Sequence, residues 1–279
     1  ETHIHQLYDS VRGAGAGKAI ATNNDAIEGG DGATYGYLSS FTSNGFVSTT
    51  GSSNNNYFNA DGATYVFWNW KAGTSVSGNT SGSGTAKAYT GSVNTDAGFS
   101  IIRHLGNDTA GHTIPHHLGA VPKMIIGHGV SGSDATSWTV YHHTLGNTHT
   151  ISLNETGAAV DSAVWNDTTP TSSVISLGSS GNVNDDDDAF ILYSFAEKKG
   201  YSKFGSYVGN GNADGPFFYT GFKPAFIIQK RSDATHDWQL HDNKRGQYFP
   251  GNVVNNRIQP NSNNAEGTGD DIGYDFLSN

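Results

Sequence analysis

Residues 223–246 of this 279-residue chain are KPAFIIQKRSDATHDWQLHDNKRG, in which two short apolar runs flank a polar loop. Short runs rich in β-branched and aromatic residues, bounded by turn-forming residues, are typical of β-strands. The stretch VPKMIIGHGVSGSDATSWTVYHHTLG at 121–146 aligns with 223–246 once its loop is shortened by two residues. Both stretches therefore predict a strand, a loop and a second strand.

Other parts of the chain also occur twice. The phrase THIHQLYDSVRG at 2–13 is identical to THDWQLHDNKRG at 235–246 in seven of twelve positions, without a gap. NADGATYVFWNW at 59–70 aligns in the same way with NDDDDAFILYSF at 184–195. These matches indicate a repeated unit of roughly 100 residues.

The repeats predict four parts of the chain. These are a partial first β-sandwich unit at 1–73, a Gly/Ser/Thr-rich linker or long loop at 74–98, a complete second unit at 99–200 and a partial third unit at 201–279. Because the outer units are incomplete, we expect either a longer chain of tandem units or neighbouring subunits that supply the absent strands.

The predicted fold class is all-β, with tandem antiparallel β-sandwich domains that are jelly-roll-like and contain very little helix. Helices are not expected because Gly or Pro interrupts every helical period of about a dozen residues. The alignment of 59–70 with 184–195 predicts two equivalent strands. One face of these strands would carry Trp68, Trp70, Tyr193 and Phe195, and the opposite face would carry Phe67 and Leu192.

Composition excludes several classes of partner. The formal net charge is −10 and no basic stripe is present, which argues against a nucleic-acid partner. No apolar stretch approaches the roughly 18 residues of a membrane helix, so membrane insertion is not expected. The absence of cysteine excludes disulfides and thiolate chemistry.

Several long motifs resemble a known family. LYDSVRGAG, SFTSNGF, YVFWNWKAG and the stretch at 205–238 are similar to a tandem-repeat β domain found in structural proteins of marine tailed bacteriophages. The resemblance implies a virion or extracellular location in a tail fibre, tail or capsid surface. It also implies homo-oligomeric contacts with other virion subunits and contact with a host cell-surface glycan. It supplies no catalytic residue and no cofactor.

Metal chemistry is not predicted, although the chain has twelve histidines. The pairs His116–His117 and His142–His143 would point to opposite faces of a strand, and His112 lacks a carboxylate at zinc-enzyme spacing. We expect surface or loop histidines with ordinary pKa values. The acidic run from Asp185 to Asp188 predicts a turn before a strand, with calcium binding as the open alternative.

A catalytic motif is also missing, so the sequence predicts a non-enzymatic protein with no catalytic, cofactor-binding or metal-binding residue. The Asp9–Arg12 and Asp242–Arg245 spacings predict ion pairs that support the fold. The alternatives are a carbohydrate-binding module or a polysaccharide depolymerase. For glycan contact, Trp165 is the candidate, because Trp138 and Trp238 recur at matched strand positions and are expected in the core.

Overall fold

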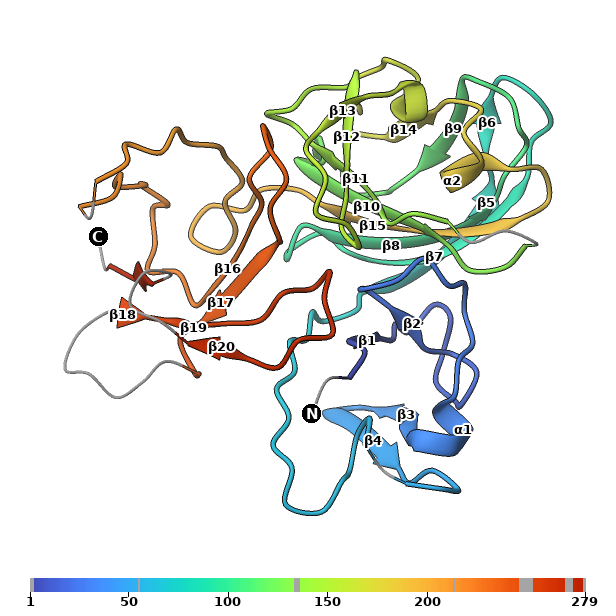
Figure 1. Ribbon diagram of the computed structural model, residues 1–279. Coiled ribbons are helices and arrows are strands. Elements are labelled where there is room, and N and C mark those ends of the chain that lie inside the picture. The colour runs from blue at the N-terminus through green and yellow to red at the C-terminus, as the bar shows by residue number, and fades with distance from the viewer. Residues whose placement is uncertain are drawn as a thin grey trace.

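The computed structural model describes residues 3–54, 56–132, 136–212, 214–245, 253–268 and 273–277. The middle segment, residues 74–195, forms a β-sandwich. The N-terminal segment, which precedes residue 74 and is drawn in blue, and the C-terminal segment, which follows residue 195 and is drawn mainly in orange and red, flank it (Figure 1). Strands dominate and helices are short, which confirms the all-β prediction. No helix in the described residues is long and apolar enough to cross a membrane.

The sandwich consists of two antiparallel sheets. The larger sheet has eight strands in the order β13-β12-β11-β10-β15-β8-β7-β5, and the smaller has three in the order β14-β9-β6. The strands of the larger sheet are β5 Thr74–Asn79, β7 Ala88–Asn94, β8 Phe99–Leu105, β10 Met124–Gly129, β11 Thr139–His142, β12 His149–Ser152, β13 Val160–Asp161 and β15 Ala189–Phe195. The smaller sheet contains β6 Ser81–Gly82, β9 His112–Pro115 and β14 Val174–Leu177, and two short helices lie nearby, the 3-10 helix η1 Ala163–Trp165 and α2 Gly181–Asn184.

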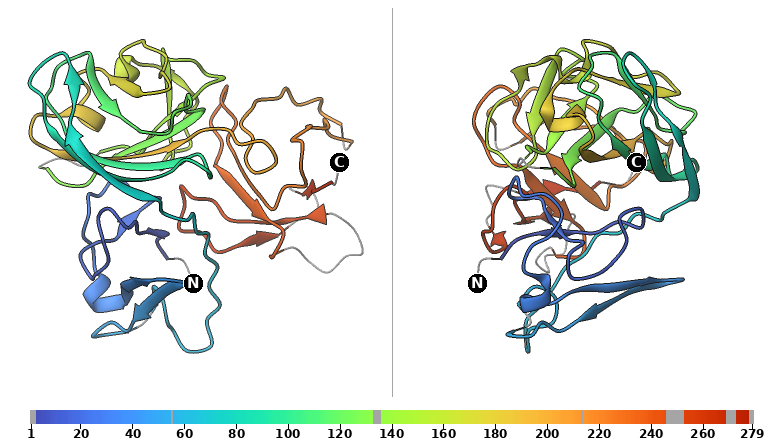
Figure 2. Two further views of the ribbon diagram at one scale, coloured as in Figure 1. Left: turned by 180° about the vertical axis from the view of Figure 1, so that it is seen from behind. Right: turned by 90° about the vertical axis from the view of Figure 1, so that its right-hand side faces the viewer.

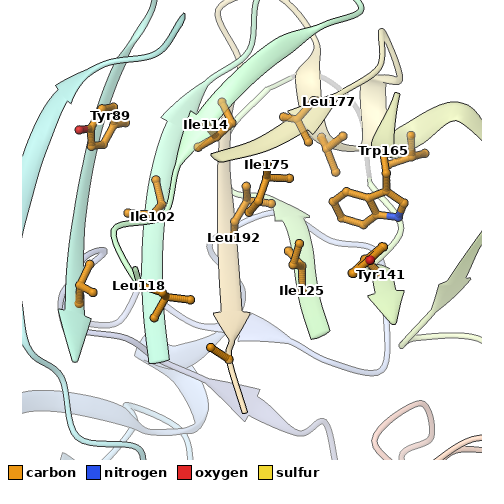
Figure 3. Close-up of a cluster of buried hydrophobic side chains, with 14 residues drawn as sticks. Tyr89, Ile102, Ile114, Leu118, Ile125, Tyr141, Trp165, Ile175, Leu177 and Leu192 are labelled. Carbon is orange, nitrogen blue, oxygen red and sulfur yellow. The ribbon is translucent and has the colours of Figure 1, made fainter. Parts of the chain in front are cut away.

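One hydrophobic core fills the space between the two sheets. Ile102, Ile125 and Leu192 project from the larger sheet toward Ile114 and Ile175 of the smaller sheet (Figure 3). All five side chains are essentially inaccessible to solvent. At about 25 cal/mol per Å² of buried apolar surface, each such side chain stabilises the fold by roughly 1.5–3 kcal/mol.

The opposite face of the larger sheet carries a second core. Ile101, Ile191 and Tyr193 on this outer face pack with Ile20 of the N-terminal segment and Trp238 of the C-terminal segment. A strand buried on both faces needs a continuous apolar run, which explains the sequence AFILYSF of β15.

The flanking segments contain only two-stranded sheets in their described residues, so the expected partial sandwiches are not present there. In the N-terminal segment β1 Gln6–Leu7 pairs with β2 Ile20–Ala21, α1 spans Gly32–Tyr35, and β3 Tyr37–Thr42 pairs with β4 Gly45–Thr49. In the C-terminal segment β16 Phe226–Gln229 pairs with β17 Gln239–Asp242, β18 Val253–Val254 with β21 Tyr274–Asp275, and β19 Asn256–Arg257 with β20 Gly267–Thr268.

The two aligned stretches of sequence form hairpins with the same register. Met124 pairs with His142 in β10–β11, and Phe226 pairs with Asp242 in β16–β17, at the positions that the alignment matches. The prediction of strand, loop and strand at 121–146 and 223–246 is confirmed.

The prediction of a Gly/Ser/Thr-rich linker or long loop at 74–98 was wrong, because this stretch supplies β5, β6 and β7. Six residue pairs join β5 to β7, and β7 pairs in turn with β8. Small residues permit this arrangement: a Cβ on Gly91 would lie 2.5 Å from both the Ile101 carbonyl oxygen and the Ile102 Cδ1 atom. The polar composition reflects β5, the exposed edge strand of the larger sheet, whereas Tyr89 and Val93 of β7 pack into the core between the sheets.

The prediction of equivalent strands at 64–70 and 189–195 was wrong for the first of them. Residues 64–70 lie outside any strand, whereas β15 pairs with β8 and β10 along both edges. Trp68 and Trp70 instead pack against Phe226 of β16, with ring centroids 6.1 and 5.8 Å apart. Phe67 is 65% exposed. An apolar run becomes a strand only where backbone partners are available beside it.

His5, Trp138 and Trp238 occupy matching positions in the three segments, and each has a similar hydrogen bond within its own segment. At each, a backbone N–H donates to an asparagine side-chain oxygen: His5 to Asn23 at 3.3 Å, Trp138 to Asn154 at 3.0 Å and Trp238 to Asn261 at 2.9 Å. The indole of Trp138 donates to the Ala21 carbonyl at 3.0 Å, and that of Trp238 donates to the Ser152 carbonyl at 2.9 Å. Each tryptophan therefore contacts the segment that precedes it.

The first and third segments also meet. The Thr22 hydroxyl donates to the Pro260 carbonyl at 2.9 Å, and the backbone of Gln259 and Ser262 interacts with the His5 ring. Both flanking segments lie against the sandwich when the molecule is viewed from other sides (Figure 2). Each segment thus contacts the other two.

Candidate functional site beside the Asp9 and Arg12 ion pair

A turn after β1 brings Asp9 and Arg12 together. The Asp9 Oδ1 atom accepts hydrogen bonds from the backbone N–H groups of Val11 and Arg12, each at 2.9 Å. The Gly13 N–H closes the turn by donating to the Asp9 carbonyl at 2.9 Å, and its φ of 87° suits glycine. The predicted ion pair follows, with Arg12 Nε 2.5 Å from Asp9 Oδ2.

The Arg12 side chain is inaccessible to solvent and has several further partners. Its Nη1 donates to the Lys18 carbonyl at 2.6 Å and to Glu28 Oε2 at 3.3 Å, and its Nη2 donates to the Leu7 carbonyl at 3.1 Å. Glu28 also pairs with the Lys18 ammonium group. A buried guanidinium needs such partners because burying an unpaired charge costs several kcal/mol.

Tyr193 of β15 connects this network to the sandwich. Its hydroxyl donates to Asp9 Oδ2 at 2.7 Å. Burial and the neighbouring Asp9 carboxylate raise the pKa of Tyr193 well above its ordinary value, so the hydroxyl stays protonated and donates.

The C-terminal segment contains a matching network. Arg245 Nε lies 2.6 Å from Asp242 Oδ2, Nη1 lies 2.6 Å from Glu266 Oε2, and Nη2 donates to the Leu240 carbonyl at 3.1 Å. The Trp68 indole N–H donates to Asp242 Oδ2 at 3.1 Å, and the Arg245 guanidinium lies 5.3 Å above the Trp68 ring. Trp68 aligns with Tyr193 in sequence, so the two carboxylates receive donors from matching positions.

The middle segment has His142 and Leu145 where the others have Asp and Arg. The His142 Nδ1 atom is hydrogen-bonded to the Thr144 hydroxyl at 2.8 Å. Burial, with a smaller effect from His143, lowers the pKa of His142 to about 4. The middle segment therefore keeps the hairpin without the ion pair.

A cavity of about 310 Å³ opens beside the Arg12 network, between the N-terminal segment and the outer face of the larger sheet. Its lining combines cationic groups, one carboxylate, hydroxyls and two small apolar side chains: Val11, Arg12, Lys18, Glu28, Thr90, Arg103, Val130 and Ser131. This volume lies within the range of small-molecule sites.

Arg103 is the distinctive residue of the cavity. It pairs in register with Thr90 of β7 and Ile191 of β15, and it lies on the same outer face of β8 as Ile101, two residues earlier. None of the residues that the structure describes forms a salt bridge with it. The other two cations of the lining, Arg12 and Lys18, are both paired with Glu28.

The family model for a domain of unknown function, DUF7483, matches residues 1–279. The chain belongs to DUF7483. No curated protein and no solved structure matches it.

In this DUF7483 domain the glycan-contact prediction for Trp165 was wrong. Trp165 ends η1 and is 0% exposed, with its ring 5.9 Å from that of Tyr141 in the core between the sheets (Figure 3). A sugar ring cannot stack on a side chain with no accessible surface. Trp138 and Trp238 are also buried, as expected.

The prediction of surface histidines with ordinary pKa values was wrong as well. His112 and His116 are fully buried, and burial lowers the pKa of each below its ordinary value. The His112 ring bridges the Asn184 and Thr80 side chains at 2.7 and 2.6 Å. His117 is exposed, and its Nε2 atom lies 2.9 Å from the Tyr89 hydroxyl. These rings therefore complete hydrogen-bond networks in the fold.

The acidic run of the DUF7483 domain follows α2 and turns into β15, as predicted. Lys87 pairs with Asp186 at 2.8 Å and with Asp187 at 2.5 Å. In the part of the chain that the structure describes, no three His, Asp or Glu side chains are placed to hold a metal ion.

The cavity itself was missed from the sequence, because its lining comes from separate stretches between residues 11 and 131. One signal was present. Arg103 interrupts FSIIRHL, the apolar run of β8, and a charged residue in such a run is informative because charges are rarely buried without a purpose.

Proposed function

We propose that this protein is a non-enzymatic structural component of a bacteriophage particle, built around one β-sandwich with two flanking segments and placed in a tail fibre, tail or capsid surface. Its partners would be other virion subunits, in a homo-oligomer, and a glycan of the host cell surface. The motif resemblance between this chain and structural proteins of marine tailed phages supports this proposal.

The observation that carries the proposal is the mutual contact of all three segments. Trp138 and Trp238 each donate to a preceding segment, and Thr22 joins the first segment to the third. Tyr193 adds a buried hydrogen bond to Asp9, and Trp68 adds a partly buried one to Asp242. A block held together in this way resists relative domain motion, which suits a part that bears load.

Antibodies against the purified chain test the proposal on gradient-purified phage particles by immunogold electron microscopy. We expect gold label at one location on the particle and the intact protein in the particle by mass spectrometry. Detection in infected cells but not in purified particles would refute the virion role.

The second candidate function, binding or cleavage of a polysaccharide, is favoured by the cavity beside Arg103. Binding without cleavage is the form that we propose. Incubation of the purified chain with host polysaccharide separates the two, because a depolymerase would shorten the polymer and a binding protein would not.

A further inference from the structure

We infer that the cavity between the N-terminal segment and the larger sheet binds an acidic sugar, with Arg103 as the residue that holds its carboxylate. This inference rests on the adhesive part of the proposed function and names the class of glycan.

The charge of the lining selects an anion. Glu28 accepts from Arg12 through one oxygen and pairs with Lys18 through the other, while Asp9 occupies the Nε side of Arg12. Arg103 is left as the cation whose charge no described residue neutralises. A guanidinium binds a carboxylate through two parallel hydrogen bonds, which makes it a suitable ligand for a uronate.

The neutral groups of the lining suit a sugar ring. The Thr90 and Ser131 side chains are exposed and can bond to hydroxyls of a sugar, although Ser131 Oγ also accepts from the Ala189 N–H at 3.2 Å. Val11 provides methyl groups against which the C–H face of a ring can lie, whereas Val130 is mostly buried at the cavity wall. A small inorganic anion would use the cation alone and would leave these groups without contact.

The walls of the cavity are already in place. The Tyr193 hydroxyl joins Asp9 to the larger sheet. The His128 Nε2 atom adds a second bond between this sheet and the N-terminal segment, because it donates to the Ala26 carbonyl at 3.0 Å. Groups that do not have to be ordered on binding cost less conformational entropy.

Calorimetric titration of the purified chain with D-glucuronate, D-glucose and acetate tests the inference. We expect glucuronate to bind and both other probes to bind at least about tenfold more weakly, because each lacks one half of the recognised chemistry. Equal binding of acetate would refute a sugar site, equal binding of glucose would refute the role of the carboxylate, and no binding of glucuronate would refute both.

Two variants locate the site. Arg103→Gln should weaken glucuronate binding by about tenfold or more, and Thr90→Val should weaken it less. Arg231→Gln removes the same charge from an exposed position in the C-terminal segment and should bind as the unaltered chain does. Unchanged binding by Arg103→Gln, or equal weakening by Arg231→Gln, would overturn the assignment.

These measurements separate the two proposals. A protein present in particles that does not bind glucuronate retains its structural role and loses only the ligand. A protein that binds glucuronate but is absent from particles retains the site and loses the virion location.

Discussion

The Tyr193 hydroxyl donates to the Asp9 carboxylate at 2.7 Å, although 184 positions separate the two residues in sequence. Asp9 also binds Arg12, so one carboxylate joins the N-terminal turn to the central strand of the sandwich. The candidate cavity lies beside this junction, which makes its geometry dependent on the junction.

Replacing Tyr193 with Phe should lower the free energy of unfolding by about 1–3 kcal/mol, because a buried carboxylate loses one of its donors. Urea unfolding measures the change. Tyr141→Phe is the matched control, since Tyr141 is also buried and its hydroxyl forms no hydrogen bond within the described part of the chain. A similar loss in both variants would show that the hydrogen bond contributes little.

Replacing Arg12 with Met should be more damaging, with a loss of about 3–5 kcal/mol, because the buried Asp9 carboxylate would lose its counter-charge and Glu28 would keep only Lys18. The same substitution at Arg231, whose ion pair with Asp233 is exposed, should have little effect. Comparable unfolding midpoints for the two variants would contradict a structural role for the Arg12 network.

Stability should fall as the pH is lowered from about 6.5 toward 4. Burial is the main cause that lowers the pKa of His104 to about 3 and those of His128 and His241 to about 4. A lowered folded-state pKa means that the unfolded chain binds protons first, so the stabilisation is complete above about 6.5 and is lost below it. For His128 alone the loss would be roughly 3 kcal/mol near pH 4.

Urea unfolding at several pH values measures this slope, and His128→Gln should make it shallower. Asp242 does not interfere in this window. Although burial opposes the effect, Arg245 and the Lys244 N–H lower the pKa of Asp242, so it titrates at a more acidic pH. Stability independent of pH between 6.5 and 4.5 would be incompatible with neutral buried histidines.

The two fully buried tryptophans should respond differently to the same substitution. Trp138→Phe removes the hydrogen bond to the Ala21 carbonyl and alters the stacking on His128, whose ring lies 4.2 Å away. Trp165→Phe removes an indole N–H that has no partner among the described residues. We therefore expect Trp138→Phe to cost about 1 kcal/mol more than Trp165→Phe in unfolding experiments.

Gly91→Ala should lower stability by about 1–3 kcal/mol, since the new Cβ would overlap the Ile101 carbonyl and the Ile102 side chain. The control is Gly181→Ala at the start of α2, where no atom lies within 4 Å of the added Cβ. A wild-type melting temperature for Gly91→Ala would mean that β7 can shift without cost.

Part of the candidate site was predictable. The spacing of Asp9 and Arg12 before a glycine predicted their ion pair, because the turn that joins them is local. The partner Tyr193 and the cavity residue Arg103 could not be predicted, since their positions depend on how distant segments pack on the outer face of the larger sheet.

The amino-acid sequence by itself determined the β class, the hairpins at 121–146 and 223–246, and the local ion pairs. Strand period, turn chemistry and spacing act over a few residues, so they can be recognised without a structure. Only the tertiary structure decided that the polar stretch from Thr74 forms strands, that 64–70 does not, and that Trp165 is buried. These outcomes depend on which backbone edges and apolar faces meet, and such contacts between remote segments leave no local pattern in the chain.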